Sequence, residues 1–409
     1  MDNETQELRL WKRRMWYINI VTLLFSILFQ GISTILSQYA VIKFGASPIQ
    51  VGLVWSTFYL TSIITRPLTG LAFDQGYRFR LLILGSITFF ISSFIYLFSS
   101  NIIHLVIARL LQGLSQGVFM TTSFSLVAYE ASEHMKYFEE SIAWRSTMLG
   151  LGVIIGPALG GYLISFYGFT ETFIFMILLA AIIPIIVYYT AKSTKVDEKL
   201  LNYSLKVHLA STLKKDLKII VKNFIELMHI ESFKAAIFSL ILYTLGYVTI
   251  TSLLPAYYAT LFGKDAGVIV GNCLALIGMS SIFPRIFTGK ISKHFSVKKI
   301  ATAGLFVLAV SIALIGVYSY PPTVYIFCFL AGLGLGFVIP SLQIMALIDT
   351  GNSKKGIATG FYIIGFDLSN LISPIIFGGL GNIFGYKFVV EVTFLPVLIA
   401  SIFLALKKF

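Results

Sequence analysis

Charged residues are scarce in this sequence. Asp, Glu, Lys and Arg make up 12% of its 409 residues, whereas a soluble globular chain carries about 25%. A surface that faces water on all sides needs more charge, so an ordinary soluble domain is excluded. Acidic residues are the scarcest, since 31 Lys and Arg outweigh 18 Asp and Glu and leave a net charge of +13.

Cysteine is almost absent. Cys273 and Cys328 both lie inside apolar runs, where a free cysteine behaves as a small hydrophobe. They indicate neither a disulfide framework nor a metal site. The sequence also has no glycine-rich nucleotide loop and no catalytic motif. We therefore expect no metal, no cofactor and no enzymatic activity, which argues against a pump driven by its own ATP hydrolysis.

Long apolar runs are abundant instead, and hydrophobic residues make up 57% of the chain. A spanning helix needs roughly 20 mostly apolar residues, and in hydrocarbon only helices or closed barrels satisfy the backbone. The runs are continuous rather than alternating, which excludes barrel strands, and the first run is too long for a cleavable signal. We predict an all-α membrane protein with twelve transmembrane helices at 16–41, 49–73, 80–100, 103–129, 143–166, 170–190, 234–258, 267–290, 300–319, 322–348, 356–380 and 387–406.

The positive charges alternate along the chain. If the N-terminus is placed inside, the outer segments hold only Lys43, Lys264 and Lys387, and the other Lys and Arg between the helices fall on the inner side. Cytoplasmic segments are rich in Lys and Arg, so we expect a multi-pass protein of the cell membrane with both termini in the cytoplasm. The net charge then reflects topology and contact with anionic membrane lipids, rather than a nucleic-acid partner.

The chain divides at a long basic connection, residues 191–232. We predict an N-terminal six-helix bundle at 1–190 and a C-terminal six-helix bundle at 233–409. Apolar residues recur within the connection near helical spacing, at Leu205, Leu209, Leu213, Ile220, Phe224 and Leu227. This pattern favours an amphipathic helix on the inner membrane face, and a partly disordered linker is the alternative.

An internal repeat relates the two bundles. With a shift of about 219 residues, Arg66 and Gly70 fall on Arg285 and Gly289, and Gly52 falls on Gly271. Further coincidences are Gly113 and Gly117 with Gly332 and Gly336, and an equal spacing in the pairs Pro157/Gly168 and Pro374/Gly385. A duplicated unit explains these coincidences together, and parallel repeats with substrate bound at their interface are a known transporter plan.

Three motifs resemble those of the major facilitator superfamily. Gly70, Asp74 and Arg78 are similar to its signature in the loop after the second helix, although the second glycine is one position early and Phe79 replaces a basic residue. Helix 143–166 looks like the signature of the drug:proton antiporter branch, with its glycines and proline at Gly152, Gly156, Pro157, Gly160 and Gly161. Arg109, Gln112 and Gly113 are similar to the buried-arginine motif. The resemblance covers essentially the whole chain and implies the fold of that superfamily and an alternating-access carrier.

Two groups of residues are candidates for gating. The glycines of helix 143–166 share a face on which helices can approach closely, and Pro157 bends the helix. Either this face seals one side of the membrane or it is ordinary packing. Asp74 and Arg78 form either a charge latch, with Asp74 at the N-terminal end of helix 356–380 and Arg78 near Glu130, or a solvated loop.

Arg109 is the most informative single residue. It lies well inside helix 103–129, where a charge is costly and usually marks a pathway or an ion pair. Its repeat partner is Cys328, so the fold itself does not require the charge. Arg109 either serves a cavity, by anchoring substrate or tuning a proton site, or is a structural arginine bonded to carbonyl groups. Other polar residues at helical spacing are candidates for lining the cavity or for joining helices: Gln30, Tyr59, Gln112, Gln116, Tyr243 and Tyr247.

Asp367 is the one carboxylate predicted near mid-membrane. Burial disfavours the charged form of a carboxyl group, so Asp367 could bind and release a proton during transport, or it could serve as packing glue with Asn370. Proton antiporters of this type often carry an acid on the first, fourth or fifth helix, and the membrane part of the first half has none. If transport is coupled to protons, Asp367 or Glu130 must serve.

Three functions remain open at this point. The first is proton-coupled export of small organic compounds, with a small-molecule substrate, protons and membrane lipids as the partners of a monomeric chain. The second is an importer or uniporter of a sugar, an organic acid or another metabolite. The third is a non-transporting membrane protein, in which the polar residues would line a dry interface.

Overall fold

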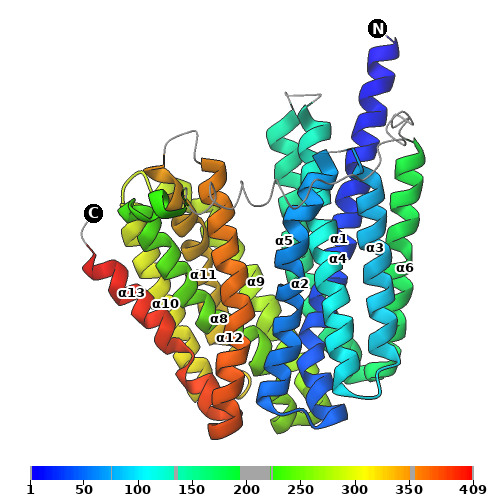
Figure 1. The fold of residues 1–409 in the computed structure, drawn as a ribbon. Helices are drawn as coiled ribbons and strands as arrows, with labels where there is room; N and C mark the ends of the chain where they lie inside the picture. Colours follow the sequence, from blue (N-terminus) through cyan, green and yellow to red (C-terminus); the bar gives the residue numbers. More distant parts are fainter. Residues whose placement is uncertain are drawn as a thin grey trace. The chain divides into compact units, whose positions relative to one another are not determined.

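The computed structural model describes residues 2–74, 76–132, 137–193, 222, 224–350 and 355–407, and only the backbone is described at some of them. Across these residues the chain is helical (Figure 1). The first six long helices are α1 Asp2–Phe44, α2 Pro48–Asp74, α3 Arg78–Leu97, α4 Ile102–Ser132, α5 Phe138–Tyr167 and α6 Phe169–Ser193. The other six are α8 Glu231–Phe262, α9 Ala266–Ile291, α10 Val297–Val317, α11 Thr323–Ile348, α12 Lys355–Val392 and α13 Phe394–Leu406.

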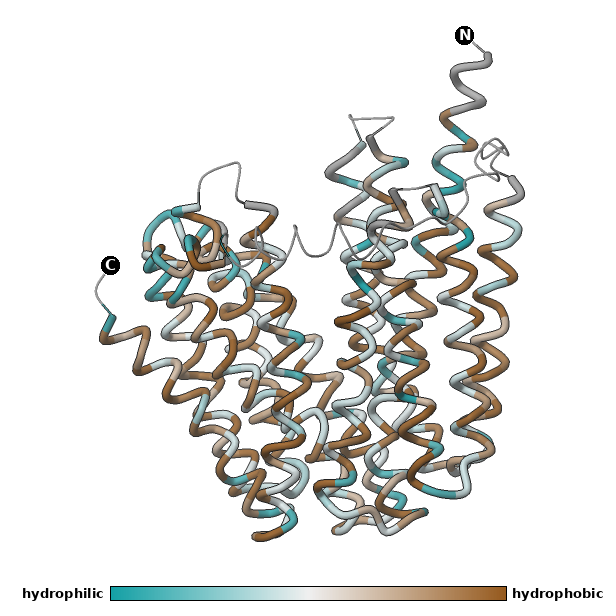
Figure 2. Tube along the Cα trace, in the orientation of Figure 1, coloured by the Kyte–Doolittle hydropathy of each residue, from teal (hydrophilic) through white to brown (hydrophobic). Residues whose placement is uncertain are grey.

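The distribution of side chains is that of a protein in lipid. Nine stretches of the described residues are long and apolar enough to cross a bilayer, and one of them, Glu231–Thr288, contains two successive helices. Large apolar side chains such as Leu178, Phe283 and Ile286 are more than 60% exposed. The polar side chains of Thr22, Ser92 and Arg109 are instead fully buried. Brown hydrophobic residues accordingly run along the length of the helices in Figure 2.

The predicted repeat is visible in matching helix contacts. On α4, a Cβ added at Gly117 would meet the carbonyl oxygen of Ser62 on α2, and on α11 a Cβ at Gly336 would meet the carbonyl oxygen of Ser281 on α9. Both pairs are related by the same shift along the sequence. Glycine at these positions lets the two helix backbones approach closely, and the repeat has kept this contact in both copies.

A second set of contacts joins a helix from the first half of the sequence to a helix from the second half. Gly52 on α2 lies against the carbonyl oxygen of Pro374 on α12, and Gly271 on α9 lies against the carbonyl oxygen of Pro157 on α5. Gly52 corresponds to Gly271 in the repeat, as Pro157 corresponds to Pro374. The reciprocity is the arrangement expected for two copies related by a pseudo-twofold axis.

The same glycine conformation occurs at corresponding positions of the two halves. Gly168 follows α5 with φ 91° and ψ 178°, and Gly385 interrupts α12 with φ 86° and ψ 164°. Only glycine adopts this conformation readily. The break at Gly385 falls in the gap between the predicted helices 356–380 and 387–406, so residues beyond it continue toward α13.

By contacts, the chain forms two compact units. Unit 1 comprises residues 1–197, 251–278 and 374–386, and unit 2 comprises residues 198–250, 279–373 and 387–409. The parts of α8, α9 and α12 that pack on the first six helices thus belong to unit 1. Most of the predicted amphipathic helix, including Leu205, Leu209, Leu213 and Ile220, lies outside the described residues. Of its predicted apolar face, Leu227 is buried and Phe224 is exposed.

Candidate functional site

Arg109 lies at the centre of a buried polar cluster in unit 1. Its side chain is 0% exposed. Nη1 donates to Ser33 Oγ on α1 at 3.2 Å and to Gln112 Oε1 one turn further along α4 at 2.8 Å. Tyr96 on α3 donates from its hydroxyl group to the same Gln112 oxygen at 2.8 Å. Three helices therefore hold one guanidinium group.

Two aromatic rings of α2 complete the surroundings of Arg109. The guanidinium carbon lies 4.7 Å from the ring centre of Trp55 and 5.2 Å from that of Phe58. Ring faces attract cations, so these contacts offset part of the cost of burial. Trp55 is itself fixed, because its Nε1 donates to Ser37 Oγ at 2.6 Å.

Among the described residues, no carboxylate forms an ion pair with Arg109. No Asp or Glu occurs in residues 8–73, 75–129 or 141–170, which include the membrane part of the first five helices. Nε and Nη2 of Arg109 and Nε2 of Gln112 have no hydrogen-bond partner among the described residues. A buried cation with unused donors is costly. The cluster can therefore offer positive charge and N–H groups to an anionic or hydrogen-bond-accepting ligand.

Arg145 on α5 is a second buried arginine, which the sequence analysis missed. It is 6% exposed, and its Nη2 donates to Ser123 Oγ at 3.0 Å and to the carbonyl oxygen of Met120 at 3.1 Å. Both acceptors lie on α4, on the stripe that continues from Arg109 through Gln112 and Gln116. The sequence signal that could have indicated a partner here is Ser123, a polar residue on the same stripe, two turns beyond Gln116.

The other predicted cavity residues are distributed over both units. Gln30, Tyr59 and Gln116 belong to unit 1, and Tyr59 lies within electrostatic range of Arg109. Gln116 Oε1 is buried without a hydrogen-bond partner among the described residues. In unit 2, Tyr243 is 2% exposed, and it and Tyr247 on α8 both lie within electrostatic range of Arg285 on α9.

Asp367 lies on α12 in unit 2 and is 2% exposed. No other Asp or Glu occurs in residues 350–390 or 266–348. Asn370 donates from its side-chain amide to the carbonyl oxygen of Phe366 at 2.7 Å. The burial predicted for Asp367 is therefore found, and its role in proton coupling stays a prediction.

Glu130, the second predicted proton carrier, lies at the end of α4. Its carboxylate pairs with Arg14 on α1 at 3.2 Å, and its carbonyl oxygen accepts a hydrogen bond from Trp11 Nε1 at 2.9 Å. Arg78 lies over the ring of Tyr129, 3.5 Å from its centre. The pairing of Glu130 with Arg14 was not predicted, because the predicted first helix began only at residue 16, whereas α1 begins at Asp2.

The remaining gating candidates differ in how much of them is described. The side chain of Asp74 lies outside the described residues, so the latch stays a prediction. A Cβ added at Gly70 would meet no atom within 4 Å. Packing therefore does not require a glycine at position 70.

The glycines of α5 lie in close helix contacts. A Cβ at Gly152 would meet the Ser26 side chain, and Cβ atoms at Gly156 and Gly160 would meet backbone atoms of α1 around Gly31. Gly161 faces the other way, and its Cβ would lie 2.1 Å from the carbonyl oxygen of Gly267 on α9. The α5 glycines thus bring α1 and the first turns of α9 against one helix.

A family model supports what these features indicate. The model described as Major Facilitator Superfamily matches residues 18–374 and again residues 287–408. The chain belongs to this superfamily. It is therefore a multi-pass membrane transporter of two related six-helix halves, and the transporter class is non-enzymatic.

Curated relatives indicate a branch of the superfamily. It is 23% identical over 351 residues to the quinolone resistance protein NorA of Staphylococcus aureus (strain MRSA252), with 83% of this chain and 82% of NorA covered. It is 23% identical over 339 residues to the class B tetracycline resistance protein of Escherichia coli, with 81% and 79% covered. These similarities are consistent with the drug:proton antiporter branch of the superfamily.

The fold also matches a solved structure. A bacterial homologue of the human lysosomal transporter Spinster, in an inward-facing and unoccupied conformation, superposes with a TM-score of 0.78 at 12% identity. The match covers 97% of this chain and 96% of that one. At this identity the likeness shows the fold alone.

Proposed function

We propose that this superfamily member is a proton-coupled exporter of small organic compounds in the cell membrane, with both termini in the cytoplasm. The observation that carries the proposal is the similarity to resistance proteins over four-fifths of the chain, together with the glycine and proline pattern of α5. The expected partners are the substrate, protons and membrane lipids, without nucleic acid, and the chain is expected to act as a monomer of two bundles, residues 1–190 and 233–409, joined by the linker 191–232.

In the proposed mechanism Arg109 polarises the cavity. A guanidinium group with unused donors attracts the acceptor or anionic groups of a substrate, and Gln112, Gln116, Gln30 and Tyr59 supply further polar contacts. Aromatic residues, including Tyr243 and Tyr247, suit the apolar parts of the substrate.

Asp367 is proposed to carry the proton, with Glu130 as the alternative. Burial favours the neutral form of a carboxyl group, so Asp367 would take up a proton from one side of the membrane and release it when the site becomes wet. Glu130 is less suited, because Arg14 stabilises its charged form.

The gating residues would alternate the access. Close packing of Gly152, Gly156, Pro157, Gly160 and Gly161 on their neighbours would seal one face against leak. Gly70, Asp74 and Arg78 would hold the opposite face closed and release it during the cycle.

Proteoliposomes test the proposal with tetracycline and a fluoroquinolone as probes. We expect an imposed pH gradient to drive their uptake into inside-out vesicles, and Asp367→Asn to abolish the dependence on the gradient. Asp265→Asn is the matched control, since Asp265 is exposed in the short helix Gly263–Asp265. Flux that ignores the gradient in the unmodified protein would contradict proton coupling, and accumulation in the opposite direction would favour an importer.

A further inference from the structure

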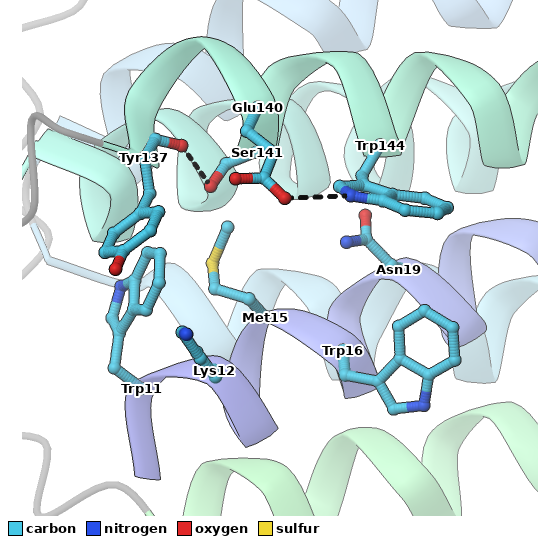
Figure 3. Close-up of a pocket in the computed structure, with 9 residues that line it drawn as sticks. All are labelled: Trp11, Lys12, Met15, Trp16, Asn19, Tyr137, Glu140, Ser141 and Trp144. Carbon is cyan, nitrogen blue, oxygen red and sulfur yellow. Dashed lines mark hydrogen bonds between the residues drawn. The ribbon is translucent and has the colours of Figure 1, made fainter. Parts of the chain in front are cut away.

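A separate cavity lies between residues 11–19 of α1 and the first turns of α5, and Arg109 is not among the residues that line it. Its volume is about 230 Å³, and Figure 3 shows the residues that line it. Three of the four tryptophans of the chain, Trp11, Trp16 and Trp144, contribute to its wall. Sites that enclose drug-sized molecules measure about 300–1,000 Å³, so this cavity suits a smaller group.

The aromatic rings form two pairs at opposite ends of the cavity. Trp11 and Tyr137 lie with ring centres 5.6 Å apart, and Trp16 meets Trp144 edge to face at 6.4 Å. Trp16 is 51% and Trp144 45% exposed, so these indoles are not simply core residues. Indole faces are the strongest aromatic binders of cations.

One charge of each sign accompanies the aromatic pairs. Lys12 Nζ lies 5.1 Å from the ring centre of Tyr137, and the Glu140 carboxylate accepts a long hydrogen bond from Trp144 Nε1 at 3.4 Å. Figure 3 shows Lys12 beside Trp11 and the Glu140 carboxylate directed toward Trp144. In the described part of the chain no ion pair joins Lys12 to Glu140, so each charge is available to a ligand.

Asn19 gives an independent indication of a ligand. It lines the cavity at the Trp144 end, is 4% exposed, and its Oδ1 has no hydrogen-bond partner among the described residues. A buried acceptor without a donor is unfavourable. An N–H group bound next to Trp144 would satisfy it.

We propose that this cavity binds a zwitterionic group, with its ammonium end against Trp144, Glu140 and Asn19 and its anionic end against Lys12. The site is distinct from the transport site under "Proposed function". The same chemistry occurs in a free zwitterionic compound and in the headgroup of a zwitterionic phospholipid, and these two sources are separable by experiment.

Tryptophan fluorescence of the detergent-solubilised full-length protein tests the site, with phosphoethanolamine and ethanolamine as probes, because their primary ammonium groups carry the N–H donors that Asn19 requires. We expect phosphoethanolamine to change the emission saturably, and Lys12→Gln and Glu140→Gln each to raise its Kd about twofold to fivefold, as exposed charge and cation–π contacts would. For ethanolamine, which lacks the anion, Glu140→Gln should weaken binding and Lys12→Gln should strengthen it. Glu171→Gln, an exposed carboxylate at the start of α6, is the control.

Two results would overturn the proposal. One is no saturable response to phosphoethanolamine by the unmodified protein. The other is a Lys12→Gln variant that binds phosphoethanolamine as tightly as, or more tightly than, the unmodified protein while passing the same size-exclusion check of folding. The first would remove the site, and the second would remove its anion-binding end.

Nanodiscs of defined lipid distinguish the sources. If the ligand is a lipid headgroup, nanodiscs rich in phosphatidylethanolamine should suppress the response to added phosphoethanolamine, whereas phosphatidylglycerol nanodiscs should retain it. If the ligand is a free compound, the response should be equal in both. A response that is absent in both lipids would again count against the site, whatever tetracycline transport shows, so the outcome is independent of the exporter assignment.

Discussion

At the scale of single residues, the sequence predicted which positions matter better than it predicted their partners. A charged residue deep in a long apolar run is unmistakable, so the burial of Arg109 and Asp367 was predictable. Its neighbours were not, because Ser33, Trp55 and Tyr96 come from three other helices, and helical periodicity does not say which helices pack together. The pair of Arg14 with Glu130 was missed for another reason, since a hydropathy criterion begins the first helix only where the apolar run begins.

The shape of the Arg109 side chain leads to a first prediction. Lysine retains the charge, but it lacks the planar group that stacks on Trp55 while donating to Ser33 and Gln112. We expect Arg109→Lys to lower transport about tenfold, the equivalent of one charge-assisted hydrogen bond of ~1.5 kcal/mol, with normal insertion in the membrane. Initial rates in proteoliposomes measure this effect.

Arg66→Lys is the control for that experiment. Arg66 is on α2, where its Nε donates to Ser62 Oγ at 3.2 Å, and its transport rate should stay near that of the unmodified protein. Equal rates for Arg109→Lys and the unmodified protein would show that only the charge at position 109 matters.

At the scale of helices, the repeat was readable from glycine spacing, and the structure explains why. Gly117 and Gly336 are each kept where two backbones touch, so selection on packing preserved them in both copies. Helix boundaries were harder to predict. The polar first turns of α1 extend well beyond the apolar run, because their Glu, Gln, Leu and Arg residues are good helix formers.

The equivalence of the two contacts can be measured. Gly117→Ala would place a Cβ 2.0 Å from Thr65 Oγ1, and Gly336→Ala would place one 2.4 Å from the carbonyl oxygen of Ser281. We expect each to destabilise the protein by about 1–3 kcal/mol through overpacking, seen as a lower Tm in detergent. Gly360→Ala, where a Cβ meets no atom within 4 Å, should leave Tm unchanged or raise it slightly. A Tm unchanged by both interface variants would mean that the helices separate at little cost.

At the scale of the whole molecule, the sequence predicted the membrane class, the number of helices and the duplication. It did not predict that the ends of α8, α9 and α12 pack with the first six helices in unit 1. Composition and periodicity describe each helix separately, whereas such contacts depend on the state of a protein whose halves are proposed to move.

Covalent linkage tests whether this packing must open during transport. Ser37 Oγ on α1 donates to the carbonyl oxygen of Ser252 on α8 at 2.7 Å, so cysteines at both positions are within reach of a short bifunctional thiol reagent. Both positions are as buried as the chain's own Cys273 and Cys328, so the native cysteines are first replaced by serine and the reagent is added during transport. We expect the treated Ser37→Cys, Ser252→Cys double variant to lose transport. The reducible form of the reagent should allow recovery after reduction.

Each single cysteine variant, treated in the same way, should transport normally. If the linked double variant still transports, α1 and α8 stay together throughout the cycle, and the closure would have to be sought elsewhere.

The reciprocal contacts of Gly52 with Pro374 and of Gly271 with Pro157 have a consequence for how such a protein diversifies. These contacts join main chain to main chain, so they do not depend on the chemistry of any larger side chain. Residues that face a cargo can therefore be exchanged during evolution while this junction keeps its shape. A lineage could acquire new compounds to carry by altering Arg109 and its neighbours, and it would inherit this backbone junction unaltered.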